Sequence, residues 1–117
     1  MGTTVYTYQK CSTCRKATDW LRRQGLPFEE KPIRETPPTQ SELAQMLRHK
    51  NGEIRKLFNT SGMDYRALGL KDKLSEMSTD EAFALLESNG NLVKRPFLLT
   101  NKGGAVGFRE PEWKTLF

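Results

Sequence analysis

Hydrophobic and polar residues in the first third of the chain follow a strand, helix, strand pattern. Residues 3–8 are typical of a short strand and lead directly into a helical pattern over 13–24. Gly25 and Pro27 are typical of the residues that end a helix, and residues 28–33 resemble a second strand. Two strands joined by one helix predict a βαβ unit with a parallel pair. The helix face that we expect to be buried carries Ala17, Trp20 and Leu21.

The middle of the chain, about 39–90, is helical in pattern and is interrupted by turn residues. Thr39 or Ser41 can cap its first helix, and Asn51 and Gly52 are expected to end it. The buried stripe of this helix is expected to contain Leu43, Met46 and Leu47. Further helical segments are predicted at 54–58, at 65–70 and from Ser78 to Asn89.

The end of the chain predicts a hairpin and a final helix. Residues 95–100 and 105–108 are two apolar runs on either side of the Gly-containing turn 101–104, and 110–117 favours a short helix. The order is therefore β-α-β, several helices, and β-β-α. That order predicts an α/β thioredoxin-like fold with a helical insertion between its two halves, in a single domain over residues 1–117.

Composition limits the classes of function. The chain has 117 residues, 36% of them hydrophobic and 28% charged, which is typical of one soluble globular domain. We see neither a membrane-spanning run of about 20 apolar residues nor a secretory signal, so we expect a cytoplasmic protein that does not enter a membrane. The net charge of +5 is spread over solvated positions without a nucleic-acid-binding motif. We therefore expect no direct contact with DNA or RNA.

The residues with the clearest chemistry are Cys11 and Cys14, between the first strand and the first helix. A thiol at a helix N-terminus is stabilised as thiolate by unpaired N–H groups and the helix dipole, and a second thiol one turn on can form a disulfide with it. Zinc would need four ligands, and the only histidine is His49, so we expect no metal. The hydroxyls of Ser12 and Thr13 suit either of two roles, binding a thiolate or anion and capping the helix.

Several motifs in one order along nearly the whole chain resemble the ArsC/Spx family. That family contains glutaredoxin-linked arsenate reductases and Spx-type redox regulators of RNA polymerase. The motifs are the segments 8–17, 37–39, 59–62, 68–73, 94–96 and 106–108.

The resemblance implies a role for Cys11 as the nucleophile that attacks an oxyanion. Arsenate reductases of this type hold the anion with three arginines. Arg95 matches one of them, Asn59 occupies the region of another, and Arg109 replaces the third only if the strand register shifts by one. Pro96 is expected to follow a cis peptide bond and to face the active-site cysteine. The incomplete arginine set argues against efficient use of arsenate.

At Cys14 the chain resembles Spx more than the arsenate reductases. Spx carries a Cys-x-x-Cys redox switch, and these arsenate reductases usually lack the second cysteine. One hypothesis is an oxidoreductase in which Cys14 resolves the intermediate on Cys11. It would bind no cofactor and would take electrons from thioredoxin, or from glutaredoxin with glutathione. The other is a redox regulator that binds the α subunit of RNA polymerase, with Gly52 at the contact. A thioredoxin-fold domain with inactive cysteines is a third reading. In each case we expect a monomer.

Overall fold

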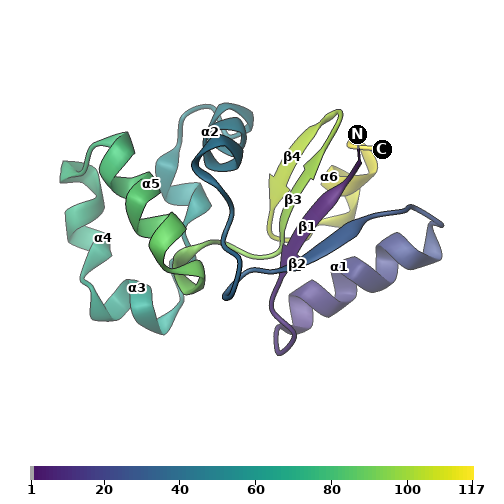
Figure 1. Cartoon of the computed structure of the whole chain (residues 1–117), viewed down its shortest axis with the longest axis horizontal. Helices are drawn as coiled ribbons and strands as arrows, with labels where there is room; N and C mark the ends of the chain where they lie inside the picture. The colour runs from purple at the N-terminus through teal and green to yellow at the C-terminus, as the bar shows by residue number, and fades with distance from the viewer. Residues whose placement is uncertain (1) are drawn as a thin grey trace.

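The computed structural model describes residues 2–117 and contains a mixed sheet of four strands in the order β2-β1-β3-β4 (Figure 1). The central strand β1, Thr4–Thr7, pairs in parallel with β2, Glu29–Pro32. On its other side β1 pairs antiparallel with β3, Phe97–Thr100, and β3 forms a hairpin with β4, Gly103–Val106. The two halves of the fold therefore meet at the pair β1–β3.

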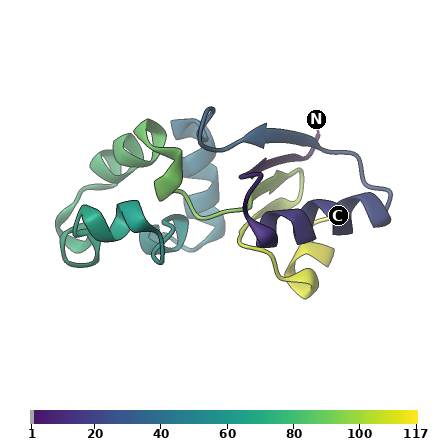
Figure 2. The ribbon, with the colours of Figure 1, turned by 90° about the horizontal axis from the view of Figure 1, so that it is seen from below.

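Two helices cover one face of this sheet. Figure 2 shows α1, Ser12–Arg23, and α6, Glu110–Lys114, on the same side of the strands. Side chains alternate between the two faces of a strand, so the residues pointing to this side form a cluster with the two helices. Its buried members are Val5, Ala17, Trp20, Leu21, Leu98, Ala105 and Trp113.

The remaining helices form a lobe beside the opposite face. Figure 1 shows this lobe in blue, teal and green, separated from α1 and α6 by the sheet. Tyr6 and Phe97 of the sheet belong to its hydrophobic cluster, so the lobe packs directly on the strands. Its elements are α2, Gln40–His49, α3, Met63–Ala67, α4, Leu70–Lys73, and α5, Thr79–Ser88, with 3₁₀ turns at Ile54–Leu57, Leu74–Glu76 and Gly90–Leu92.

This arrangement confirms the predicted α/β thioredoxin-like fold with helices between its β-α-β and β-β-α halves. Within residues 2–117, none of the helices is long and apolar enough to cross a membrane.

Strand boundaries differ from the sequence prediction in the hairpin. The turn is only Asn101–Lys102, and β4 runs over 103–106 instead of 105–108. Gly104 permits this register, because a Cβ there would lie 3.0 Å from the Leu99 side chain and the Met46 methyl group. The glycines expected in the turn are therefore part of the strand, where α2 packs closely.

Three other elements were also placed inexactly. The helix predicted at 65–70 is two short helices, because Gly69 adopts a left-handed φ of 64° between them. The final helix stops at Lys114, and Leu116 and Phe117 after it lie partly buried against the cluster beneath α6. Strand β3 begins at Phe97 rather than residue 95.

The first helix of the lobe is fixed by its N-terminal cap. Thr39 is the N-cap of α2: its side chain accepts a hydrogen bond from the Glu42 backbone N–H at 3.2 Å. The Glu42 carboxylate in turn accepts one from the Thr39 N–H at 2.9 Å, and another from the Tyr6 hydroxyl at 2.6 Å. The cap therefore also ties α2 to strand β1.

We predict that Thr39→Ala lowers the free energy of unfolding by about 1 kcal/mol, because it removes this cap. Ser41→Ala is the matched control, since Ser41 lies exposed within the first turn of α2 and is not the cap. Urea unfolding of both variants measures the difference. Equal losses of stability would contradict the assignment of the cap to Thr39.

Candidate functional site

The Cys11 thiol forms the cap of helix α1. Its backbone is extended, and its Sγ atom accepts a hydrogen bond from the Cys14 backbone N–H at 3.3 Å. The Cys11 N–H donates to the Tyr8 carbonyl at 2.9 Å, which fixes the loop after β1. Ser12 and Thr13 are exposed in the first helical turn. The capping role considered for their hydroxyls thus belongs to the cysteine sulfur.

The two thiols have opposite electrostatic environments. Partial burial on its own would raise the pKa of Cys11, but hydrogen bonds from the side chain and backbone of Cys14, with the charge of Arg95, lower that pKa below its ordinary value. Burial, reinforced by the hydrogen bond to Cys11, raises the pKa of Cys14 to about 12. Cys14 is 2% exposed, whereas Cys11 is partly accessible, and both are free thiols. One thiol is therefore activated and reachable, and its neighbour is held protonated.

Arg95 carries the positive charge that faces Cys11. The peptide bond between Arg95 and Pro96 is cis, as the family resemblance implied. The guanidinium lies 4.8 Å from the centre of the Tyr8 ring. Its Nη1 atom is buried and has no hydrogen-bond partner among the described residues. Because an unpaired buried donor is costly, this N–H group is suited to an acceptor on a bound molecule.

A small polar cleft of about 230 Å³ opens beside this arginine. Arg34 also lines this cleft. Its guanidinium lies 4.9 Å from the centre of the Tyr8 ring, and its Nη1 donates to the Tyr8 hydroxyl at 2.9 Å. The cleft is lined by Tyr8, Arg34, Asn59, Gly62, Met63, Asp64, Asn91 and Arg95.

Sequence reasoning missed Tyr8 and Arg34 as parts of the site. A signal for Arg34 was present, because it follows the predicted strand that pairs in parallel with the first one. The carboxyl ends of parallel strands lie at the same edge of a sheet, so residues just after both strands are brought together. Tyr8 had no such signal, since its ring is placed by contacts with two distant arginines.

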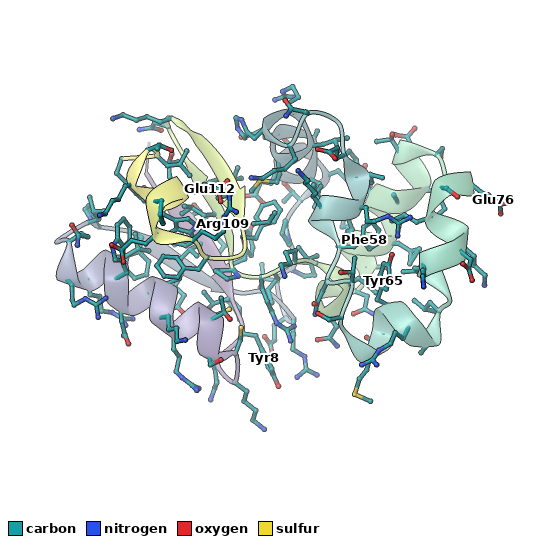
Figure 3. The ribbon with its side chains drawn as sticks, turned by 180° about the vertical axis from the view of Figure 1, so that it is seen from behind. Tyr8, Phe58, Tyr65, Glu76, Arg109 and Glu112 are labelled. Carbon is teal, nitrogen blue, oxygen red and sulfur yellow. The ribbon has the colours of Figure 1, made fainter. Side chains whose placement is uncertain are left out.

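The structure does not bring Arg109 to this cleft. Arg109 is the N-cap of α6, its side chain is 80% exposed, and it lies 4.0 Å from Glu112. Figure 3 shows this pair on the α6 side of the molecule, away from Tyr8. Arg109 instead borders a second cleft of about 560 Å³ together with Lys94. The structure therefore places Arg109 at a different cleft from the one that Arg95 lines.

No cluster of three or more His, Cys, Asp or Glu side chains that could hold a metal ion is found in the part of the chain that the structure describes.

The fold and the site together define a class of protein, a thioredoxin-like domain with a Cys-x-x-Cys pair at the start of its first helix. Comparison with known proteins gives the family: the ArsC family model matches residues 6–116, and the chain belongs to the ArsC family.

Three relatives illustrate the range of this family. The uncharacterized protein YusI of Bacillus subtilis is 45% identical over 114 residues, which are 97% of each chain. The global transcriptional regulator Spx of Streptococcus mutans is 29% identical over 93% of this chain and 78% of its own length. The crystal structure of an ArsC family related protein from Bacteroides fragilis superposes with a TM-score of 0.92, at 39% identity over 100% of this chain and 98% of that one.

We predict that Arg95→Gln raises the pKa of Cys11, because it removes the positive charge that stabilises the thiolate. The rate of alkylation by iodoacetamide follows the thiolate fraction. Its pH profile should therefore shift to higher pH, and the rate at neutral pH should fall.

Arg23→Gln is the matched control for this experiment, since Arg23 lies exposed in the last turn of α1, at the end opposite to Cys11. An unchanged profile in Arg95→Gln would show that Arg95 does not act on the thiol.

A separate measurement with Cys11→Ser, in which only Cys14 remains, should show very slow alkylation at neutral pH, because Cys14 is buried and its pKa is raised.

Proposed function

We propose that this protein is a cytoplasmic thiol–disulfide oxidoreductase in which Cys11 is the nucleophile and Cys14 the resolving thiol. The observation that supports this most is the contrast between the two thiols. Cys11 has a lowered pKa and is partly exposed, and Cys14 is buried and protonated within hydrogen-bonding distance of it. This contrast supports attack by the Cys11 sulfur and resolution by the Cys14 sulfur.

The first step is attack of the Cys11 thiolate on one sulfur of a disulfide, RS–SR. A bond forms between Cys11 Sγ and that sulfur, the RS–SR bond breaks, and one thiolate leaves. The negative charge on Cys11 is then gone, together with the hydrogen bond that it accepted from the Cys14 thiol. Both had raised the pKa of Cys14, so their loss helps Cys14 to lose its proton.

The second step is attack of the Cys14 thiolate on Cys11 Sγ. It releases the second RS⁻ and leaves a Cys11–Cys14 disulfide, so the dithiol has given two electrons to the substrate. The protein needs no bound cofactor for this chemistry. Thioredoxin, or glutaredoxin with glutathione, would return the two electrons by reducing the protein disulfide.

Arsenate is a second substrate to consider for the same thiolate. Arg95 Nη1 and the free N–H groups of Ser12 and Thr13 at the helix N-terminus are suited to its oxygens. Asn59, however, lines the cleft where the resemblance implies an arginine, and Arg109 is elsewhere. Charge-assisted hydrogen bonds are about twice as strong as neutral ones, so we expect arsenate to bind weakly.

The test follows NADPH oxidation with a small disulfide or with arsenate as substrate, coupled to thioredoxin or to glutaredoxin with glutathione. We expect turnover of the disulfide, slower turnover of arsenate, and loss of at least about a hundredfold in Cys11→Ser, because the nucleophile is gone.

Cys14→Ser is the informative companion in this assay. It should still form the mixed disulfide on Cys11, seen as a mass increase, but should not release the second thiol. Turnover of Cys11→Ser at the wild-type rate would exclude the proposed roles.

The Spx relative favours a second candidate function, a redox-dependent contact with the C-terminal domain of the α subunit of RNA polymerase. Gly52, which the resemblance places at such a contact, is exposed, and its Cβ position has nothing within 4 Å. A larger side chain there would project from the surface and would block a partner without disturbing the core.

We predict for this candidate that Gly52→Arg abolishes binding of that isolated polymerase domain. Gly52 has a φ of 79°, which strains any other residue, so Gly52→Ala is the control that introduces the same strain without the bulk. Calorimetry on the reduced and the oxidised protein measures the contact. Absence of binding by wild type in both redox states would remove this candidate.

A further inference from the structure

We propose that the cleft between Arg34 and Arg95 binds a carboxylate of a low-molecular-weight organic disulfide while Cys11 attacks that disulfide. This inference rests on the proposed thiol–disulfide exchange and identifies the chemical class of its substrate. Arg34 then becomes a substrate-binding residue, in addition to the arginine next to the cis proline.

The first support is the arrangement of the two guanidinium groups around one tyrosine. Both lie within 5 Å of the Tyr8 ring centre, at 4.9 Å for Arg34 and 4.8 Å for Arg95. Contacts with an aromatic ring and the hydrogen bond from Arg34 to the Tyr8 hydroxyl hold the exposed Arg34 side chain in position. Tyr8 is thus the structural link that places two cations on one cleft.

The second support is the charge that the cleft presents. Its lining includes two arginines and one carboxylate, that of Asp64. The Asp64 carboxylate accepts hydrogen bonds from the side-chain amides of Asn89 at 3.0 Å and Asn91 at 3.3 Å. One oxygen of the Asp64 carboxylate is therefore already hydrogen-bonded by neighbouring amides. The Arg95 Nη1 donor, in contrast, is buried and has no hydrogen-bond partner among the described residues. A planar guanidinium matches the geometry of a carboxylate.

The third support is the size and position of the cleft. It holds about 230 Å³, several times the roughly 30 Å³ that one water occupies in the liquid. Cys11 does not line it but is next to it, through the hydrogen bond to the Tyr8 carbonyl and through Arg95. A molecule that uses both must therefore extend from the sulfur to a charged group some bonds away, as an organic disulfide with a carboxylate does.

The experiment compares three disulfides of similar size and different charge, all reacting with the reduced protein. They are dithiodipropionate, which is anionic, hydroxyethyl disulfide, which is neutral, and cystamine, which is cationic. Stopped reactions analysed by mass give the rate at which Cys11 is oxidised. Each rate is divided by that of dithiothreitol with the same compound, which removes differences in intrinsic reactivity.

Wild type should prefer the anionic disulfide over the neutral one by roughly tenfold, as expected for a charge-assisted hydrogen bond to a carboxylate. Arg34→Gln should lose most of this preference, because the guanidinium that would hold the carboxylate is gone. Arg34→Lys should retain part of the preference, and Arg23→Gln, the exposed control, all of it.

Three results would overturn the inference, and they can be told apart. If wild type reacts with the neutral disulfide but does not prefer the anionic one, the protein has the proposed activity but no carboxylate-binding site in this cleft. An equal slowing of all three compounds in Arg34→Gln means that Arg34 affects Cys11 reactivity and does not bind a carboxylate. No reaction of Cys11 with any of the disulfides would remove the proposed function itself, and this inference with it.

Discussion

One hydrogen bond, from the Cys14 backbone N–H to Cys11 Sγ, connects the fold to the chemistry. It makes the cysteine sulfur the cap of α1, so the start of the helix and the position of the thiol are set together. The hydrogen bond from the Cys14 thiol, this backbone bond and the charge of Arg95 together stabilise the thiolate, which lowers the pKa of Cys11. The same turn buries Cys14, and burial raises the pKa of that thiol. The different properties of two chemically identical side chains therefore begin at one helix terminus, and Arg95 adds to the contrast.

The helical lobe completes the site by close packing against the sheet half. Gly90 lies against the backbone of Ile33, and a Cβ at Gly90 would overlap the Ile33 carbonyl oxygen. Only glycine permits this approach, which joins the turn after α5 to the segment after β2. The next residues on the two segments are Asn91 and Arg34, and both line the small cleft. The lobe is thus one wall of the cleft.

Relatives of this chain in the ArsC family include a transcriptional regulator and an uncharacterized protein, so the family by itself does not give the reaction. Our proposal of thiol–disulfide exchange, rather than reduction of an oxyanion, is supported by the charged groups of the site. Its positive groups are Arg95 near the Cys11 thiol and Arg34, both against the Tyr8 ring, and neither Asn59 nor Arg109 completes an arginine set around an oxyanion. This arrangement suits an extended anionic molecule better than a compact tetrahedral one.

The sequence by itself determined the order of elements, the fold class and the Cys-x-x-Cys pair, because hydrophobic periodicity, helix caps and turn residues are local signals. Strand β4 was misplaced, since its register depends on how closely Gly104 approaches Met46 of α2. The predicted parallel strand pair carried a signal for Arg34, but the tertiary structure decided which arginines line the cleft. Arg34 reaches the cleft because β2 is parallel to β1, and Arg109 does not, because it caps α6 on the other side. The position of Tyr8 between two arginines and the place of Arg109 depend on packing between residues far apart in the chain, which no local pattern encodes.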